Sequence, residues 1–270
     1  MRKIAIHSVP RSGSSWLGAI LDSSEDVVYK FQPLFSYAFK SAISDVSSEE
    51  EIALFFEKLF TTKDDFLDQI EKKDRGIVPT FNKTDPRIIV YKEVRYHYIL
   101  ENLLEKDPNT FVIGLIRNPF SVLNSWYNAP REFRKDLGWN FEEEWRFAPQ
   151  KNLNKREEYN GYEKWKEVAQ LFNSLKIKFP STFYLLRYED LLLNTQGEVR
   201  KMFEFLDLDF GDQTKEFLSN SMQRKDNDPY SVYKVKNAKK ENNVKFNLPE
   251  NVIKKIEYDL KGTELESYLS

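Results

Sequence analysis

The stretch Lys3-Ile-Ala-Ile-His-Ser-Val-Pro-Arg-Ser-Gly-Ser-Ser-Trp-Leu-Gly-Ala-Ile-Leu21 determines how the rest of this chain is interpreted. Its apolar run predicts a short buried strand, and a proline and a glycine then mark a tight turn. Ser14 and Ser15 stand where a helix would begin. Because a helix N-terminus carries unpaired N–H groups and the positive end of the helix dipole, it attracts anions. With Arg11 and three serine hydroxyls around it, this turn predicts a phosphate-binding site.

The composition limits the class of protein. A length of 270 residues favours one domain over 1–270, and 40% hydrophobic with 15% aromatic residues predicts a globular chain. The absence of cysteine excludes disulfides and thiolate metal sites, and a net charge of −2 argues against a nucleic-acid binder. There is no apolar run of eighteen residues, and the first strand begins at once, so we expect no membrane span, no signal peptide and a cytoplasmic location.

Strands and helices alternate along the remaining sequence. Further buried strands are predicted at about 27–30, 86–93, 110–116 and 182–187, and helices at about 48–73 (a pair), 96–105, 119–126, 162–178, 195–206, 213–221 and 249–260. The acidic pair is interpreted as scaffold, and the aromatic and charged residues 131–160 as a surface insertion near the site. This alternation predicts an α/β fold with a parallel sheet and helices on both faces.

Helix caps support several of these boundaries. Ser48 with Glu51 forms a predicted capping box, Asn118 is a predicted N-cap before a proline, and Thr195 with Glu198 is predicted to cap the helix that ends near residue 206.

The carboxyl ends of the predicted strands gather cations. Ligands of parallel α/β sheets bind at this edge. Four basic residues fall there: Arg11, Lys92, Arg117 and Arg187. The first turn is not a Walker A loop, because no lysine follows its glycine, and no strand end supplies the acidic residue that usually holds Mg²⁺. We therefore expect a phosphate site that requires no metal.

Three motifs resemble, in order and spacing, those of the sulfotransferases that use 3′-phosphoadenosine 5′-phosphosulfate (PAPS). Pro10-Arg-Ser-Gly-Ser-Ser-Trp-Leu17 resembles the family's 5′-phosphosulfate loop. Ile116-Arg-Asn-Pro-Phe-Ser-Val-Leu-Asn-Ser125 resembles its 3′-phosphate motif, and Leu186-Arg-Tyr-Glu-Asp-Leu191 resembles a third block. The resemblance spans about 10–260 and is closest to the carbohydrate sulfotransferases. It implies a single-domain, P-loop-like fold that binds PAPS as donor.

The first motif implies the residues that hold the phosphosulfate. Arg11 would contact the sulfonate and the bridging oxygen, where its charge offsets that of the departing phosphate. The backbone and hydroxyls of the loop would hold the 5′-phosphate through Ser12, Gly13, Ser14 and Ser15. Lys92 matches a lysine that approaches the sulfonate in cytosolic members, although an isolated exposed lysine is the alternative.

The later motifs imply the rest of the nucleotide site. Arg117 and Ser125 would bind the 3′-phosphate, and Ser121 would assist because it shares a helix face with Ser125 at the i, i+4 spacing. Trp16 and Tyr188 match positions that contact adenine, with a core aromatic and a structural tyrosine as the alternatives. Between residues 234 and 245 five lysines form either a solvated charged loop or a loop that closes over a polyanion. Lys234 is the one that we assign to the nucleotide.

The general base is not settled by the motifs. Transfer to a hydroxyl needs a group that takes its proton. Gln32 stands where many members have a glutamate, and Val94 where cytosolic members have a histidine. Glu93 is the residue that we assign as base, and the alternatives are His97, His7 or an acid from 131–160.

The acceptor follows from the resemblance alone. A sugar or glycoconjugate hydroxyl is favoured, and a small alcohol, a phenol or a peptidyl tyrosine is the alternative. A non-catalytic nucleotide-binding protein of the same fold is the second hypothesis, because Gln32 replaces the usual glutamate. No nucleic-acid partner is expected.

Overall fold

A computed structural model describes residues 1–224, 226, 228, 230–233 and 248–270 of the chain. Within those residues, five parallel strands form one sheet in the order β2-β3-β1-β4-β5. The strands are β1 (Arg2–His7), β2 (Val27–Phe31), β3 (Ile88–Glu93), β4 (Thr110–Ile116) and β5 (Phe183–Arg187). The predicted parallel α/β sheet is confirmed. Because the strand order changes direction at the central β1, a crevice is expected beyond its carboxyl end.

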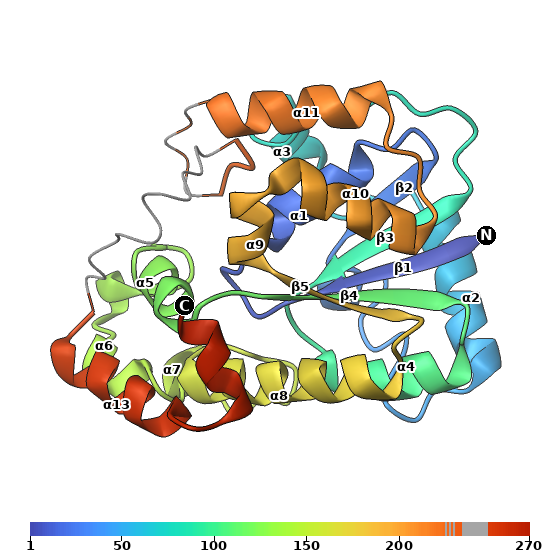
Figure 1. Ribbon diagram of the computed structural model, residues 1–270. Coiled ribbons are helices and arrows are strands. Elements are labelled where there is room, and N and C mark those ends of the chain that lie inside the picture. The colour runs from blue at the N-terminus through green and yellow to red at the C-terminus, as the bar shows by residue number, and fades with distance from the viewer. Residues whose placement is uncertain (225, 227, 229, 234–247) are drawn as a thin grey trace.

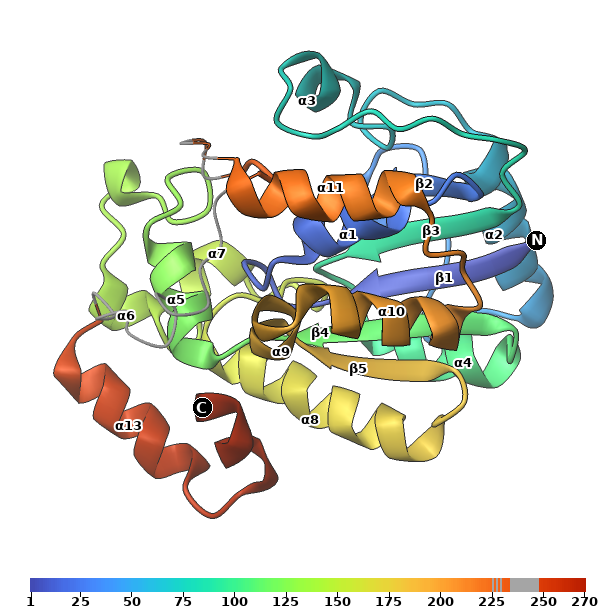
Figure 2. The ribbon, with the colours of Figure 1, turned by 45° about the horizontal axis from the view of Figure 1, so that its top comes forward.

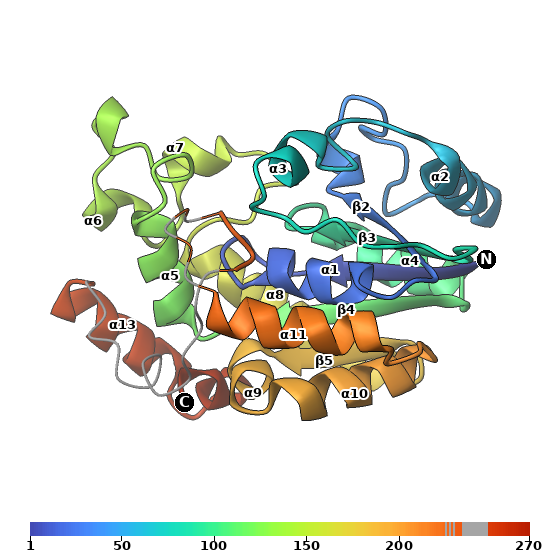
Figure 3. The same ribbon diagram turned by 90° about the horizontal axis from the view of Figure 1, so that it is seen from above.

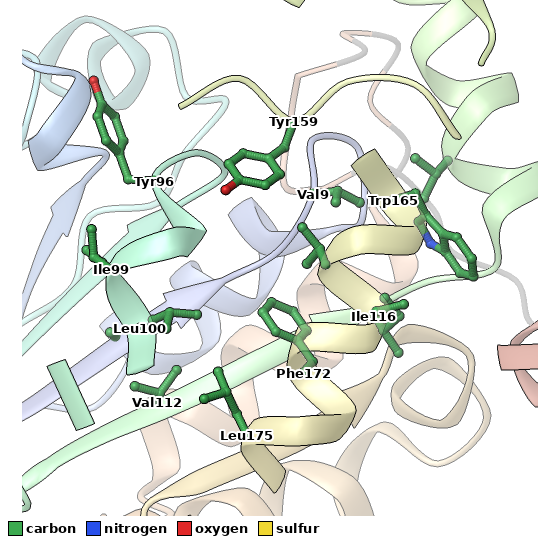
Figure 4. Packing of buried hydrophobic residues seen from close by; sticks show 14 of the residues in the cluster. Val9, Tyr96, Ile99, Leu100, Val112, Ile116, Tyr159, Trp165, Phe172 and Leu175 are labelled. Atoms are coloured by element: carbon green, nitrogen blue, oxygen red, sulfur yellow. The ribbon is translucent and has the colours of Figure 1, made fainter. Parts of the chain in front are cut away.

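Helices cover both faces of the sheet, as predicted (Figure 1). One face carries α1 (Ser14–Asp22), α9 (Tyr188–Leu193), α10 (Thr195–Leu206) and α11 (Asp212–Gln223). The other face carries α2 (Glu49–Thr61), α4 (Leu100–Lys106) and α8 (Tyr162–Lys178). In Figure 4, Val112 and Ile116 of β4 pack against Phe172 and Leu175 of α8. The two apolar cores hold the strand ends, and hence the site, in a rigid frame.

The remaining elements surround the carboxyl ends of the strands or extend the layer that contains α2, α4 and α8. They are η1 (Pro33–Phe35), α3 (Ile70–Asp74), η2 (His97–Ile99), α5 (Pro119–Tyr127), η3 (Lys135–Leu137), α6 (Phe141–Glu144), α7 (Pro149–Asn152), α13 (Glu250–Leu260) and η4 (Glu264–Leu269). Figures 2 and 3 agree that α5, α6 and α7 gather at one end of the sheet, beyond the arrowheads of β1 and β3 in Figure 2. None of the helices in the described ranges is long and apolar enough to cross a bilayer.

Residues 131–160 are more than a surface insertion. Their aromatic side chains Phe133, Phe141, Trp145 and Tyr159 are buried in the core shared with α5 and α8. The weak sequence periodicity arises because the segment turns through short helices, so no single face repeats. This packing fixes the segment beside the carboxyl ends of the strands.

The helix caps agree with the sequence in two cases and differ in one. The Ser48–Glu51 capping box is present, and Asn118 caps α5 by accepting from the N–H groups of Phe120 and Ser121. Asn194, not Thr195, caps α10, because its side chain accepts from Gly197 N at 3.2 Å. The predicted helical pair over 48–73 is present as α2 and α3, which are separated by residues 62–69, where the Asp64 carboxylate accepts from two following N–H groups and closes a turn.

Candidate functional site

A cavity of about 500 Å³ opens at the carboxyl ends of β1, β3 and β4. Its volume suits a nucleotide-sized ligand. It is lined by most of the residues that the motifs predict for the donor: Arg11, Gly13, Ser14, Ser15, Trp16, Lys92, Arg117, Ser125 and Tyr188. Ser12 is fully buried behind this wall, and Lys234 lies outside the described residues.

The turn after β1 presents the start of α1 to the cavity. Gly13 takes the N-cap position with φ 92°, and no side chain of the described residues caps the helix. The first backbone bonds inside the helix run from Trp16 N and Leu17 N to Gly13 O. The N–H groups of this first turn and the hydroxyls of Ser14 and Ser15 are therefore placed to bind an anion.

Replacing Gly13 by alanine is expected to destabilise the protein by about 2–4 kcal/mol, because two costs add. The added Cβ would lie 2.3 Å from Cε2 of Tyr188, and the backbone has positive φ. Gly138 is the matched control: its φ is 77° and nothing lies within 4 Å of an added Cβ. Gly138→Ala should cost only the backbone term, about 1 kcal/mol. Urea unfolding of both variants measures the difference, and equal losses would contradict the predicted contact.

Two arginines meet at this turn. The Arg117 Nη1 donates to the Arg11 carbonyl oxygen at 3.0 Å, and the Arg11 Nε donates to Ser125 Oγ at 3.2 Å. The Arg117 guanidinium also lies 4.5 Å from the centre of the Tyr188 ring. The contacts join the loop after β1 to the end of β4 and to helix α5. Each of the two hydrogen bonds connects residues more than 100 positions apart in the sequence. Two cationic groups from separate motifs thus face one cavity.

Helix α5 turns a polar stripe toward the cavity. Ser121, Asn124, Ser125 and Asn128 recur at helical spacing, and all four line the cavity. The opposite face of α5, including Leu123 and Trp126, is buried in the core. The sequence expectation that Ser121 and Ser125 share one face agrees with this arrangement.

Trp16 is both a core residue and a wall of the cavity. It is 2% exposed, its Nε1 donates to Ser221 Oγ at 3.0 Å, and its ring meets the Tyr188 ring edge-on. Trp16 is therefore a core aromatic that also borders the cavity, and its contact with adenine stays a prediction.

Lys92 projects into the cavity from the end of β3. Its side chain is almost completely buried, and its Nζ lies 4.5 Å from the centre of the Phe31 ring. Burial, with the positive charge of Lys72 nearby, lowers the pKa of Lys92 to about 7. A lysine in this state gains from any anion that enters the cavity, because the anion restores its charged form.

Glu93 is not among the residues that line the cavity. It is fully buried on the opposite side of β3, where its Oε1 accepts from Leu34 N at 2.8 Å. Burial raises the pKa of Glu93 to about 8. The cause is strand alternation: Lys92 and Val94 face the cavity, so the residue between them must face away. The same alternation could have been read from the sequence.

The two histidines form a buried pair away from the cavity. His7 Nδ1 and His97 Nδ1 lie 3.0 Å apart, so one ring donates and the other accepts. Burial lowers the pKa of His7 to about 3 and that of His97 well below its ordinary value. Both rings are therefore neutral at physiological pH and belong to the core.

Gln32 lines the cavity with a partner that the motifs do not predict. Arg95 Nη1 donates to Gln32 Oε1 at 2.9 Å, and Arg95 Nε donates to the carboxylate of Glu158 at 2.9 Å. The ion pair and the face of the Phe35 ring fix the Arg95 guanidinium. Arg95 therefore orients the Gln32 amide rather than leaving it free to rotate.

Glu132 is the one carboxylate among the described residues that line the cavity. Its Oε2 lies 3.1 Å from Lys151 Nζ. Burial alone would raise the pKa of Glu132, but Lys151, Arg11 and Arg95 outweigh burial and lower it below its ordinary value. On the sequence alone, this alternative base could be named only as an acid from 131–160, because Glu132 belongs to no motif.

Two further residues complete the comparison with the sequence. Arg187 does not line the cavity, since its Nη2 donates to the Ser270 carbonyl oxygen at 2.7 Å. Tyr230 does line it, and its ring centre lies 5.3 Å from the Arg11 guanidinium. Over the part of the chain that the structure describes, no group of three or more His, Cys, Asp or Glu side chains is arranged to hold a metal ion.

Known proteins show the same architecture. The sequence model of the family described as "Sulfotransferase domain" matches residues 1–256. Mouse sulfotransferase SULT7A1, solved with PAP, is 12% identical with a TM-score of 0.55 over 99% of this chain and 87% of its own. The sulfotransferase domain of the curacin biosynthetic pathway is 19% identical, with a TM-score of 0.53 over 96% and 97% of the two chains.

A third solved structure extends the likeness. Retinol dehydratase, in complex with androsterone and the inactive cofactor PAP, is 15% identical with a TM-score of 0.52 over 98% of this chain and 83% of its own. At these identities the likeness establishes the fold. No curated protein sequence matches the chain.

Proposed function

This chain belongs to the sulfotransferase domain family, and we propose that it transfers a sulfonate group from PAPS to a hydroxyl of its acceptor, with a sugar or glycoconjugate as the favoured acceptor. A single domain over 1–270 and a cytoplasmic location remain predictions.

The observation that supports the donor is the pair of anion-binding groups in one cavity. The start of α1 with Arg11 forms one, and Arg117 with Ser125 forms the other. PAPS carries anionic groups at both its 5′ and 3′ positions, and the purine would lie against Trp16 and Tyr188. The uncapped helix start and the cavity volume of about 500 Å³ fit such a ligand. PAPS supplies an activated sulfonate on a phosphate leaving group.

Different residues of this chain stabilise the developing charge and accept the proton during the transfer. The acceptor oxygen forms a bond to sulfur, the bond from sulfur to the bridging oxygen breaks, and its electron pair goes to the 5′-phosphate. Arg11 and Lys92 line the cavity where that charge develops, so they stabilise it electrostatically. The hydroxyl proton needs a base, and Glu132 is the ionised carboxylate that faces Arg11 and Lys92 in the cavity. We assign Glu132, in place of Glu93, to this role.

The second candidate, a nucleotide-binding protein without catalysis, was suggested by the glutamine at 32. Gln32 is held by Arg95 with its amide in the cavity wall, where it can orient an acceptor hydroxyl. The carboxylate that Gln32 lacks is present on Glu132, which comes from a different segment. Because the cavity contains a carboxylate that can accept a proton, an enzyme is favoured over a non-catalytic nucleotide-binding protein.

We expect the purified protein to release 3′-phosphoadenosine 5′-phosphate (PAP) from PAPS only when a suitable hydroxyl acceptor is present. A panel of sugars, glycans, small alcohols, phenols and tyrosine peptides should be assayed for PAP release, with sugars expected to give the fastest turnover. PAP should raise the melting temperature in EDTA as much as in Mg²⁺. Stabilisation by Mg-ATP but not by PAP would refute the proposal, and PAP binding without turnover of any acceptor would support the scaffold.

A further inference from the structure

Lys72 is a cavity-lining cation that belongs to none of the donor motifs. It lies in α3, and its Nζ is 4.1 Å from the centre of the Phe31 ring, the same ring that Lys92 Nζ contacts at 4.5 Å. Two ammonium groups against one ring repel each other. Burial and neighbouring positive charge lower the pKa of Lys72. The arrangement costs free energy in the empty cavity and is relieved by an anion.

The order of the strands places Lys72 on the acceptor side of the cavity. Arg117 follows β4, the helix-start loop follows β1, Lys92 is the penultimate residue of β3, and Phe31 ends the edge strand β2. From the 3′-phosphate side, the cavity therefore passes the 5′-phosphosulfate side and Lys92 before it reaches Phe31 and Lys72. The residues after β4, β1 and β3 suffice to bind the donor, so Lys72, beyond them at β2, is left for the acceptor.

Three carboxylates of the described residues act on Lys72, and each is paired with another side chain. Glu71, Asp228 and Glu132 act on Lys72 through their charge. Glu71 and Asp228 both pair with Arg75, at 3.4 and 3.3 Å. Glu132 pairs with Lys151 at 3.1 Å. The nearby Arg131 adds a positive charge. Within the part of the chain that the structure describes, the Lys72 ammonium therefore faces the cavity with the Phe31 ring as its contact and without an ion pair.

We propose that Lys72 binds an acidic group of the acceptor, so that the hydroxyl to be sulfonated belongs to a molecule that also carries a carboxylate, phosphate or sulfate. This inference rests on the proposed sulfonate transfer, because that function defines which end of the cavity receives the acceptor. The Phe31 ring and the aliphatic part of Lys72 form the wall against which the acceptor lies.

The test measures binding of acidic and neutral probes to the protein saturated with PAP. Sodium glucuronate should bind more tightly than glucose, and inorganic phosphate should also bind. Lys72→Met should weaken glucuronate about tenfold or more, since a hydrogen bond to a charged group contributes on this scale. Affinity for PAP should change less than about twofold. Methionine keeps the packing on Phe31, and the Lys72 carbonyl oxygen that accepts from Ile77 N stays in place.

Lys73→Met is the matched control, because Lys73 also belongs to α3 but does not line the cavity. It should leave the affinities for glucuronate and phosphate unchanged. Equal binding of glucuronate and glucose by the wild type would overturn the inference, as would unchanged glucuronate binding in Lys72→Met.

A donor role for Lys72 gives a different result. If Lys72 contacts the sulfonate of PAPS, Lys72→Met weakens PAPS relative to PAP and leaves glucuronate unaffected, which overturns the inference while the proposed function stands. If the wild type does not bind PAP at all, the proposed function fails. Loss of phosphate binding in nucleotide-free Lys72→Met would then still identify an anion site at Lys72.

Discussion

Replacing Arg117 by alanine is expected to abolish the stabilisation of this protein by PAP. Arg117 lies at the end of β4, stacks on Tyr188, and holds the Arg11 carbonyl at 3.0 Å. Its loss removes both the charge assigned to the 3′-phosphate and a support for the loop after β1. Charge-assisted hydrogen bonds to phosphate are strong, so the Kd for PAP should rise about a hundredfold or more. Calorimetric titration and thermal shift with PAP measure this change.

Arg187→Ala is the control for this variant. Arg187 is also an arginine at a strand end, but its guanidinium bonds to Ser270 outside the cavity. It should bind PAP as the wild type does. Arg117→Lys keeps the charge but loses the planar guanidinium, so we expect an intermediate Kd. A larger loss of PAP affinity in Arg187→Ala than in Arg117→Ala would show that the second phosphate site has been placed on the wrong strand.

Replacing Glu132 by glutamine is expected to lower kcat about a hundredfold to ten-thousandfold, the range that general-base catalysis provides. Glutamine has the same shape and can still accept from Lys151, so the fold and the affinity for PAPS should be preserved. The measurement is the steady-state rate with the fastest acceptor of the panel, together with Kd for PAPS. Unchanged kcat would exclude Glu132 as the base.

The pH dependence separates a base from a merely structural carboxylate. A base acts when it is deprotonated, so the rate falls as the pH falls through its pKa. Because Lys151, Arg11 and Arg95 hold the pKa of Glu132 below its ordinary value, this acidic limb should lie below the usual glutamate range. Lys151→Met removes one of these charges and should move the limb to higher pH. In Glu132→Gln the limb should be absent.

Glu93→Gln tests the assignment that the sequence favoured. Glu93 lies outside the cavity lining and its pKa is raised to about 8 by burial, so at neutral pH it is mainly protonated. The variant should retain most of the activity, because an amide can replace a protonated carboxyl that accepts from Leu34 N. A collapse of kcat in Glu93→Gln with normal turnover in Glu132→Gln would restore the sequence assignment.

The difference between Glu93 and Glu132 shows where prediction from the sequence ended. Strand alternation in the sequence already argues against Glu93, because consecutive strand residues point to opposite faces and Lys92 faces the cavity. Glu132 lies five residues beyond the end of α5, in a segment without clear periodicity. Its approach to Arg11 depends on the packing of Phe133 and its neighbours into the core. No local pattern encodes such an approach.

Two cations that line the cavity, Arg95 and Lys72, were likewise not predicted from the sequence. Arg95 belongs to no motif and comes into the cavity wall through its bonds to Gln32 and Glu158. Lys72 lies in a helical pair that the sequence interpreted as scaffold, and only the fold brings α3 over the end of β2. By contrast, Arg11, Lys92 and Arg117 were predicted together because each stands at the end of a predicted strand, and Ser125 was assigned through the resemblance of its motif.

The sequence by itself determined the alternation of strands and helices, the parallel sheet, and the gathering of Arg11, Lys92 and Arg117 at the carboxyl ends of its strands. These features rest on short-range physics: apolar periodicity, helix starts that expose N–H groups, and the rule that parallel strands bring their carboxyl ends to one edge. The tertiary structure decided which side chains from outside the motifs reach the cavity, namely Lys72, Arg95 and Glu132. Their positions depend on the closure of long loops onto the core, which the periodicity of a single segment cannot encode.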